Sequence, residues 1–290
     1  MFTGTRMKAN WGLVLLPPLV FCMLLLLGTQ WVFLRSSFFE DLGIGRLGTE
    51  FQLNNYFTVF ADPFFFSALT LNFKLAAGVV VCTLLVAYPV AYTVARMRAR
   101  WAIIFLSAIV VTSFVSIVIK VLGIIILFAA DGPMVKTLKS LGILSERFAV
   151  IGTMPGVIIG LTHLAIAFMV MMLFSVIQTI PRSLEEAAEI HGAPRWRVFL
   201  RVIIPLSLPG VVSASLLLFN VIMGAFVSAL LLGGGKIMTL PVVIQRTIML
   251  YSEYGMAAAL SAVLMLFVLT INILSVFLVT RMRAASSAVT

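Results

Sequence analysis

Long apolar runs, separated by short polar segments, dominate the pattern of this chain. Six of these runs approach or exceed the roughly 20 residues that a helix needs to cross a bilayer. Each must be helical, because hydrocarbon offers no partner for an unpaired backbone amide. We therefore expect an all-α, polytopic membrane protein, with spans at about residues 12–34, 67–95, 101–128, 150–178, 203–231 and 256–280.

The composition supports this class. Hydrophobic residues make up 62% of the chain, against about 45–50% in soluble domains. The formal net charge of +10 could indicate nucleic-acid binding, but Lys and Arg lie mainly at span ends, as the positive-inside effect predicts. Cys22 and Cys82 lie inside apolar runs, where free cysteine acts as a small hydrophobe. We expect no nucleic-acid partner, disulfide or metal site.

The apolar run after Lys8 reaches about Leu34, which is longer than the apolar part of a usual signal peptide. We expect it to be the first span. Counting basic residues near the span ends gives the orientation. Eleven lie on one side and seven on the other, which predicts that both termini are cytoplasmic. The eleven are Arg6, Lys8, Arg96, Arg98, Arg100, Arg182, Arg195, Arg197, Arg201, Arg281 and Arg283.

These spans predict three regions. Residues 1–66 hold the first span and a long, aromatic periplasmic loop, whose Phe and Tyr side chains either anchor at the membrane interface or contact a partner. Residues 67–280 form a core of five spans, and residues 281–290 are a cytoplasmic tail. No soluble domain of any size is expected.

The segment Glu186–Pro209 is too polar to lie in lipid, and the residues before it signal the start of a short helix. Ser183 and Glu186 have the spacing of a capping box. Glu185, Glu186 and Glu189 would lie near the positive end of the helix dipole. Gly192 predicts the end of this helix, because glycine accepts a left-handed backbone conformation at little cost.

A second helix is expected to open at Pro194, and Pro205 and Pro209 to break or kink it where the chain re-enters the membrane. The first helix, at about residues 183–192, would expose acidic and small residues. Ala187 and Ala188 would let a partner surface approach closely. On local physics alone, an ordinary solvated loop between two spans is an equal alternative.

The spacing of this segment is specific. Glu186-Ala187-Ala188, three residues, Gly192, nine residues and then Val202-Ile203-Ile204-Pro205 resembles the EAA signature of permease subunits in binding-protein-dependent ABC importers. Tyr88-Pro89-Val90-Ala91-Tyr92, followed by Ala95-Arg96, is similar to a stretch of the spermidine/putrescine-type permeases. The likeness runs from about residue 50 to the C-terminus.

The resemblance implies the transmembrane domain of a type I ABC importer in the bacterial inner membrane. It implies that the short helix is a coupling helix, which inserts into a cleft of an ATPase dimer. It further implies a second, different permease subunit and a periplasmic binding protein. The residues expected to couple to the ATPase are Glu185, Glu186, Ala187, Ala188, Glu189, Gly192 and Pro205.

No GxxxxGK[ST] phosphate loop occurs in the sequence; Gly233-Gly234-Gly235-Lys236 lacks the spacing and the Ser or Thr. We therefore expect a non-catalytic subunit without a cofactor of its own, with ATP and Mg²⁺ bound by the partner ATPase. A secondary transporter would need ion-coupling carboxylates at the midplane, and an assembly protein would leave the motif spacing unexplained.

Polar residues inside spans are candidates for the solute pathway, because they are costly in lipid. Lys120, His163 and Asn220 are the candidates, and each has a structural alternative. Lys120 could form a pair or snorkel to the outer face, His163 could be a packing histidine, and Asn220 could bond between helices. No acidic residue falls in a predicted span. Recognition of a polyamine, a multivalent cation, in a membrane would favour buried carboxylates. An amino-acid-like, opine-like or other small polar solute is therefore as strong an expectation as the polyamine that the resemblance implies.

Overall fold

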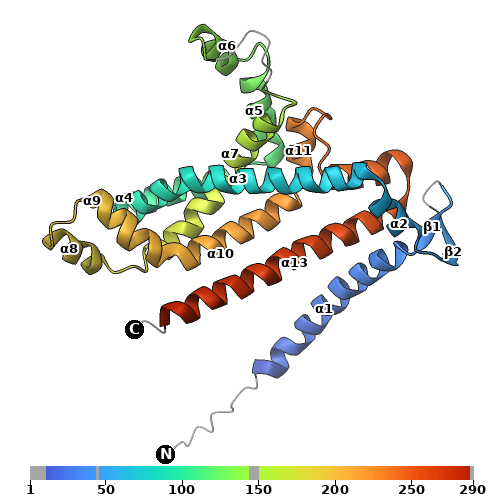
Figure 1. The fold of residues 1–290 in the computed structure, drawn as a ribbon, viewed down its shortest axis with the longest axis horizontal. Helices are drawn as coiled ribbons and strands as arrows, with labels where there is room; N and C mark the ends of the chain where they lie inside the picture. Colours follow the sequence, from blue (N-terminus) through green and yellow to red (C-terminus); the bar gives the residue numbers. More distant parts are fainter. Residues whose placement is uncertain (1–10, 44–45, 144–149, 288–290) are drawn as a thin grey trace, which may run out of the picture. The chain divides into compact units, whose positions relative to one another are not determined.

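The computed structural model describes residues 11–43, 46–143 and 150–287 (Figure 1). Arg6 and Lys8, two of the eleven basic residues on the predicted cytoplasmic side, lie outside these ranges, as do the side chains of Arg281 and Arg283. Within these described ranges, six helical stretches are long and apolar enough to cross a membrane, which confirms the predicted number. They are Leu15–Ser36, Pro63–Arg96, Ile117–Ser140, Met154–Ile177, Arg195–Met223 and Tyr254–Phe277.

The described residues are mostly helical, with one short hairpin that the sequence did not predict. The helices are α1 (Trp11–Ser36), α2 (Asn54–Ala61), α3 (Pro63–Arg96), α4 (Ala99–Ser113), α5 (Ile117–Phe128), α6 (Pro133–Ser140), α7 (Met154–Ile177), α8 (Arg182–Ile190), α9 (Arg195–Val198), α10 (Ile204–Met223), α11 (Val227–Leu232), α12 (Leu240–Arg246) and α13 (Tyr254–Ser287). Two π-helical turns are η1 (Phe199–Ile203) and η2 (Thr247–Tyr251), and the strands are β1 (Phe39–Asp41) and β2 (Leu47–Phe51).

Two predicted spans are divided in the structure. The third, expected at 101–128, is broken into α4 and α5. Thr112 and Ser113 both donate their hydroxyls to the Ile109 carbonyl (2.7 and 2.9 Å) where α4 ends, a local bond that competes with the helical pattern. The fifth, expected at 203–231, ends at Met223 instead. The Met223 carbonyl accepts a hydrogen bond from the buried Asn72 amide (3.0 Å), and α11 follows as a separate helix.

The chain divides into two compact units, and the first combines residues 1–62 with 246–263. In this unit β1 and β2 are antiparallel, with Phe39 opposite Phe51. The Asp41 carboxylate accepts the backbone N–H groups of Gly255 and Met256 at 2.8 and 2.9 Å, and so caps the start of α13. The regional boundaries at residues 66/67 and 280/281 remain predictions.

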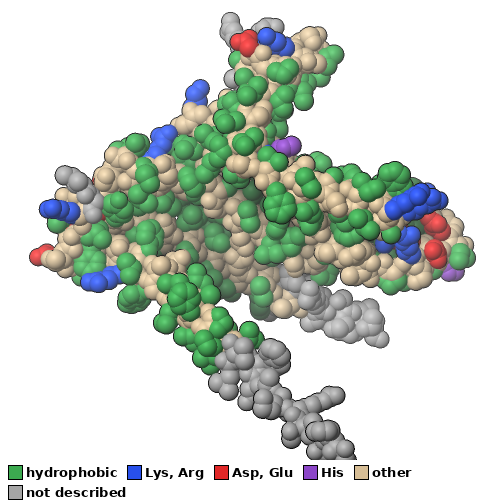
Figure 2. All heavy atoms as spheres, turned by 180° about the vertical axis from the view of Figure 1, so that it is seen from behind, with side chains coloured by type: hydrophobic (Ala, Val, Ile, Leu, Met, Phe, Trp, Pro, Cys, Tyr) green, Lys and Arg blue, Asp and Glu red, His purple; other side chains and the backbone are tan. Residues whose placement is uncertain are grey.

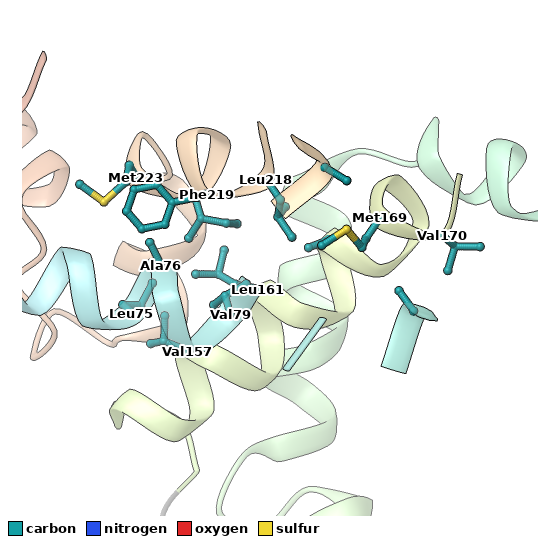
Figure 3. Packing of buried hydrophobic residues seen from close by; sticks show 14 of the residues in the cluster. Leu75, Ala76, Val79, Val157, Leu161, Met169, Val170, Leu218, Phe219 and Met223 are labelled. Atoms are coloured by element: carbon teal, nitrogen blue, oxygen red, sulfur yellow. The ribbon is translucent and has the colours of Figure 1, made fainter. Parts of the chain in front are cut away.

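The second unit holds residues 63–245 with 264–290, and its core lies where α3, α7 and α10 pack together. Gly210 allows close contact between α10 and α7, because a Cβ there would lie 2.4 Å from Val176 Cγ1. Hydrophobic side chains also cover the flanks of this unit (Figure 2), as expected for a surface in lipid. Figure 3 shows the buried cluster formed by Leu75, Ala76 and Val79 of α3, Val157, Leu161, Met169 and Val170 of α7, and Leu218, Phe219 and Met223 of α10.

Candidate functional site

Helix α8 and its surroundings contain the segment that the sequence singles out, and α8 lies at the Arg96 end of α3 (Figure 1). The helix begins one residue earlier than predicted, at Arg182. Pro181 takes the N-cap position in an extended conformation (φ −60°, ψ 134°), and no side chain caps the helix. The expected capping box of Ser183 and Glu186 is therefore wrong, because Ser183 lies inside the first turn.

The end of α8 confirms the predicted stop at Gly192, which has a φ of +79°. The Gly192 N–H bonds to the Glu189 carbonyl at 2.9 Å, and the Ala193 N–H bonds to the Ala188 carbonyl at 3.1 Å. These two bonds form a Schellman motif, in which the residue after the C-cap is left-handed. The helix is thus sharply bounded at this end by one glycine.

The chain after Gly192 differs from the prediction. Pro194 is the N-cap of α9 rather than its first helical residue. The helix then runs without a break from Arg195 to Met223, through η1 and past Pro205 and Pro209. The Ile204 N–H bonds to the Phe199 carbonyl, five residues back. This wider turn lies directly before Pro205, which cannot donate, so the helix accommodates the proline by a π-helical turn instead of breaking.

One face of α8 is exposed, as predicted. Glu186, Ala187 and Glu189 are exposed, Ala188 is half-buried, and Ile190 is 84% exposed. Among the described residues, Glu186 forms no ion pair. Charged side chains gather at this end of the unit (right in Figure 2), in contrast to its apolar flanks. The exposed face therefore combines a carboxylate, a small residue and an apolar side chain.

Glu185 departs from this pattern, although the sequence grouped it with the exposed carboxylates. Its side chain is only 15% exposed and forms an ion pair with Arg96, at 2.5 Å from Oε1 to Nη2. The Tyr92 hydroxyl donates to the other oxygen, Oε2, at 2.9 Å. Sequence reasoning did not assign Arg96 and Tyr92 to this site. The only signal for them was that both belong to the Tyr88–Arg96 stretch of the family resemblance.

Further bonds connect the same end of α3 to its neighbours. Arg96 donates to the Ile180 carbonyl at 3.3 Å, and Arg182 donates to the Ala95 carbonyl at 3.4 Å. Tyr92 and Tyr88 both pack edge-on against Phe199. A cleft of about 650 Å³ lies between these elements, and its lining includes Tyr92, Arg96, Glu186, Glu189, Trp196 and Phe199.

Burial decides which ion pair holds α8 in place. Removing one partner of an ion pair costs more when the pair is better shielded from water, because the other charge then stays desolvated without a counterion. Exposed pairs contribute about 0–1 kcal/mol. Arg195 and Glu189 form such a pair, at 3.5 Å with side chains 92% and 47% exposed. The Arg96–Glu185 pair is therefore the stronger connection between α8 and the membrane-spanning helices.

The candidate pathway residues lie on three different helices. Lys120 is half-buried on α5, and His163 is exposed on α7. Asn220 of α10 exchanges two hydrogen bonds with Asn272 of α13, at 2.9 and 3.0 Å. Its amide thus has the interhelical partner that was the structural alternative for this residue. Among the described residues, no group of three His, Cys, Asp or Glu side chains could hold a metal ion.

Known membrane transport proteins resemble this chain over most of its length. Residues 87–284 match the family described as the binding-protein-dependent transport system inner membrane component. The spermidine/putrescine transport system permease protein PotB of Escherichia coli K12 is 31% identical over 214 residues, which cover 74% of this chain and 78% of that protein. The PotB protein of Haemophilus influenzae is 28% identical and covers 79% of each chain.

A solved structure shares the fold. It is a bacterial ABC transporter involved in the import of the acidic polysaccharide alginate, and one of its chains aligns with a TM-score of 0.78 at 18% identity. The alignment covers 94% of this chain and 96% of that one. The predicted fold, the transmembrane domain of a type I ABC importer, is therefore confirmed.

Proposed function

Because the chain belongs to the family of binding-protein-dependent transport system inner membrane components, and is thus the permease subunit of an ABC importer, we propose that α8 is its docking helix for a separate ATPase. Membership of this family excludes the two alternatives, a secondary transporter and an assembly protein. In this proposal the permease is non-catalytic and forms half of the pathway. ATP and Mg²⁺ are bound and used by the partner.

The observation that carries this proposal is the form of α8, a short helix that ends sharply at Gly192 and exposes a carboxylate face. Glu186 is exposed and meets no cation among the described residues. A groove on the ATPase that presents a basic side chain would complement it. Ala187 lets the groove approach closely, and the exposed Ile190 supplies apolar contact area.

Docking to an ATPase requires α8 to lie in the cytoplasm, which also places both termini there. The support is the charge of this end of the protein, where α3, α4, α8 and α9 meet. Seven basic residues occur in these helices, in the link between α3 and α4, and in η1: Arg96, Arg98, Arg100, Arg182, Arg195, Arg197 and Arg201. The positive-inside effect favours the cytoplasm for such a cluster.

For the solute, we propose a small polar organic compound, with a polyamine as the first candidate. The support is the permease relatives, which are named for spermidine and putrescine transport. A sulfoquinovosyl glycerol permease of Agrobacterium fabrum is also similar, at 29% identity over 194 residues. Similar permeases are thus named for chemically different solutes. Amino-acid-like and opine-like solutes stay as alternatives, and Lys120, His163 and Asn220 stay candidate pathway residues.

Thermal denaturation of the partner binding protein, followed by uptake into proteoliposomes holding the complete transporter, tests this assignment. We expect spermidine or putrescine to raise the melting temperature, since a ligand at 100 times its Kd stabilises by about 2.7 kcal/mol. The same compound should then enter the vesicles only with ATP. Stabilisation by an amino acid or opine alone would overturn the polyamine assignment, and uptake without the ATPase would overturn the ATP-driven mechanism.

A further inference from the structure

The cytoplasmic end of α3, in the proposed orientation, holds α8 by both oxygens of one carboxylate. Arg96 pairs with Oε1 of Glu185 and Tyr92 donates to Oε2, at 2.5 and 2.9 Å. Both members of the ion pair are only 15% exposed. With its two oxygens occupied by residues of this chain, Glu185 is not available as a contact for a partner in this conformation.

Arg96 also reaches the segment before α8. Its guanidinium donates to the Ile180 carbonyl at 3.3 Å, while Arg182 of α8 donates back to the Ala95 carbonyl at 3.4 Å. Arg96 and its neighbours thus connect the end of α3, the segment between α7 and α8, and the first turn of α8. A guanidinium suits this role because its fixed, planar set of donors binds a carboxylate and a carbonyl together.

Helix α3 is also connected to α10, at two points along its length. Tyr88 and Ser207 share a buried hydrogen bond of 2.6 Å, and further along α3 the Asn72 amide donates to the Met223 carbonyl at 3.0 Å. Tyr92 adds an aromatic contact with Phe199. Two connections therefore join α8 to α10, one through α3 and one through the chain that continues from α8 into α9 and η1.

We infer that Glu185, Arg96 and Tyr92 are positioning residues that transmit movement of α8 to α3, an inference that rests on the proposed coupling role of α8. Glu186 and Glu185 then have different roles. The exposed Glu186 contacts the ATPase, and the largely shielded Glu185 holds α8 against α3. Without the contacts of Glu185 with Arg96 and Tyr92, the ATPase would still bind and hydrolyse ATP, but α8 would move without displacing α3.

The experiment measures the solute transported per ATP hydrolysed by the complete transporter in proteoliposomes, together with the amount of ATPase that copurifies. The variants are Arg96→Gln, Glu185→Gln and the charge-swapped pair Glu185→Arg with Arg96→Glu. Arg98→Gln is the matched control, since Arg98 is exposed. Tyr92→Phe removes only the hydroxyl and keeps the ring against Phe199, so it tests the same connection if a charge variant fails to fold.

We expect each single charge variant to retain the ATPase and to lose at least about fivefold in solute per ATP, the low end of usual coupling between sites. Tyr92→Phe should lose less, in the same direction, and the swapped pair should recover. Unchanged ratios in Arg96→Gln and Tyr92→Phe would overturn the inference. So would loss of the ATPase from Glu185→Gln alone, which would mark a direct contact. Failure of the proposed function itself would look different, because the unaltered permease would not retain the ATPase.

Discussion

Replacing Glu186 by lysine should abolish solute uptake while leaving the protein inserted in the membrane. Glu186 is exposed on α8 and forms no ion pair among the described residues, so its substitution breaks no bond within the described part of the chain. Exposed substitutions of this kind change stability by about 0.5 kcal/mol or less. At a docked surface, placing like charges together costs several kcal/mol, and each 1.4 kcal/mol corresponds to about tenfold in affinity.

Uptake assays and copurification of the ATPase measure the two consequences together. Gln178→Lys is the matched control, because it adds a positive charge at an exposed position at the end of α7, outside α8. It should leave uptake unchanged, whereas Glu186→Lys should lose both the ATPase and uptake. Normal uptake by Glu186→Lys would contradict the role given to α8.

Replacing Gly192 by valine should have a comparable effect for a different reason. Gly192 has a φ of +79°, yet nothing lies within 4 Å of a Cβ built there. The restriction is therefore on the backbone and not on space. A left-handed conformation costs an L-residue about 1–2 kcal/mol, with β-branched residues the least tolerated. Valine should displace the end of α8 from its docking position.

Asparagine at the same position separates an effect of the backbone conformation from an effect of the added side chain. Asn adopts the left-handed conformation more readily than other L-residues, and the open surroundings accommodate its side chain. We expect Gly192→Asn to keep most of the uptake that Gly192→Val loses. Equal loss in both variants would show that the docked partner needs a bare glycine. Equal activity in both would show that the end of α8 does not matter for transport.

Length and hydropathy were enough to predict the fold class and the number of spans, because the bilayer forces each long apolar run into a helix. They could not predict the breaks inside two of these runs. The first break coincides with hydroxyl-to-carbonyl bonds of Thr112 and Ser113, and the second with the Asn72 bond to Met223. Neither changes the apolar character of the run. The hairpin of β1 and β2 was not predicted either, because the loop that contains it has mixed polarity.

At α8, local rules predicted the end of the helix and its exposed face, but not its start, where Pro181 takes the N-cap position expected for Ser183. Gly192 ends the helix because of its own backbone, and Glu186 and Ala187 are exposed because they lie on a short polar helix. The same rules failed for Glu185. Its environment is set by Tyr92 and Arg96, and Tyr92 lies 93 residues away in the sequence. A contact over such a distance depends on how α3 and α8 pack.

The claim that α8 docks to an ATPase is tested most directly by photocrosslinking in the assembled transporter. A photoreactive amino acid in place of Ala187 would lie on the exposed face of α8. The control is the same amino acid in place of Val111, which is 66% exposed on the apolar helix α4 and would face lipid. We predict an adduct with the ATPase subunit from position 187 and none from position 111. No ATPase adduct from position 187 in a transporter that takes up solute would contradict the claim.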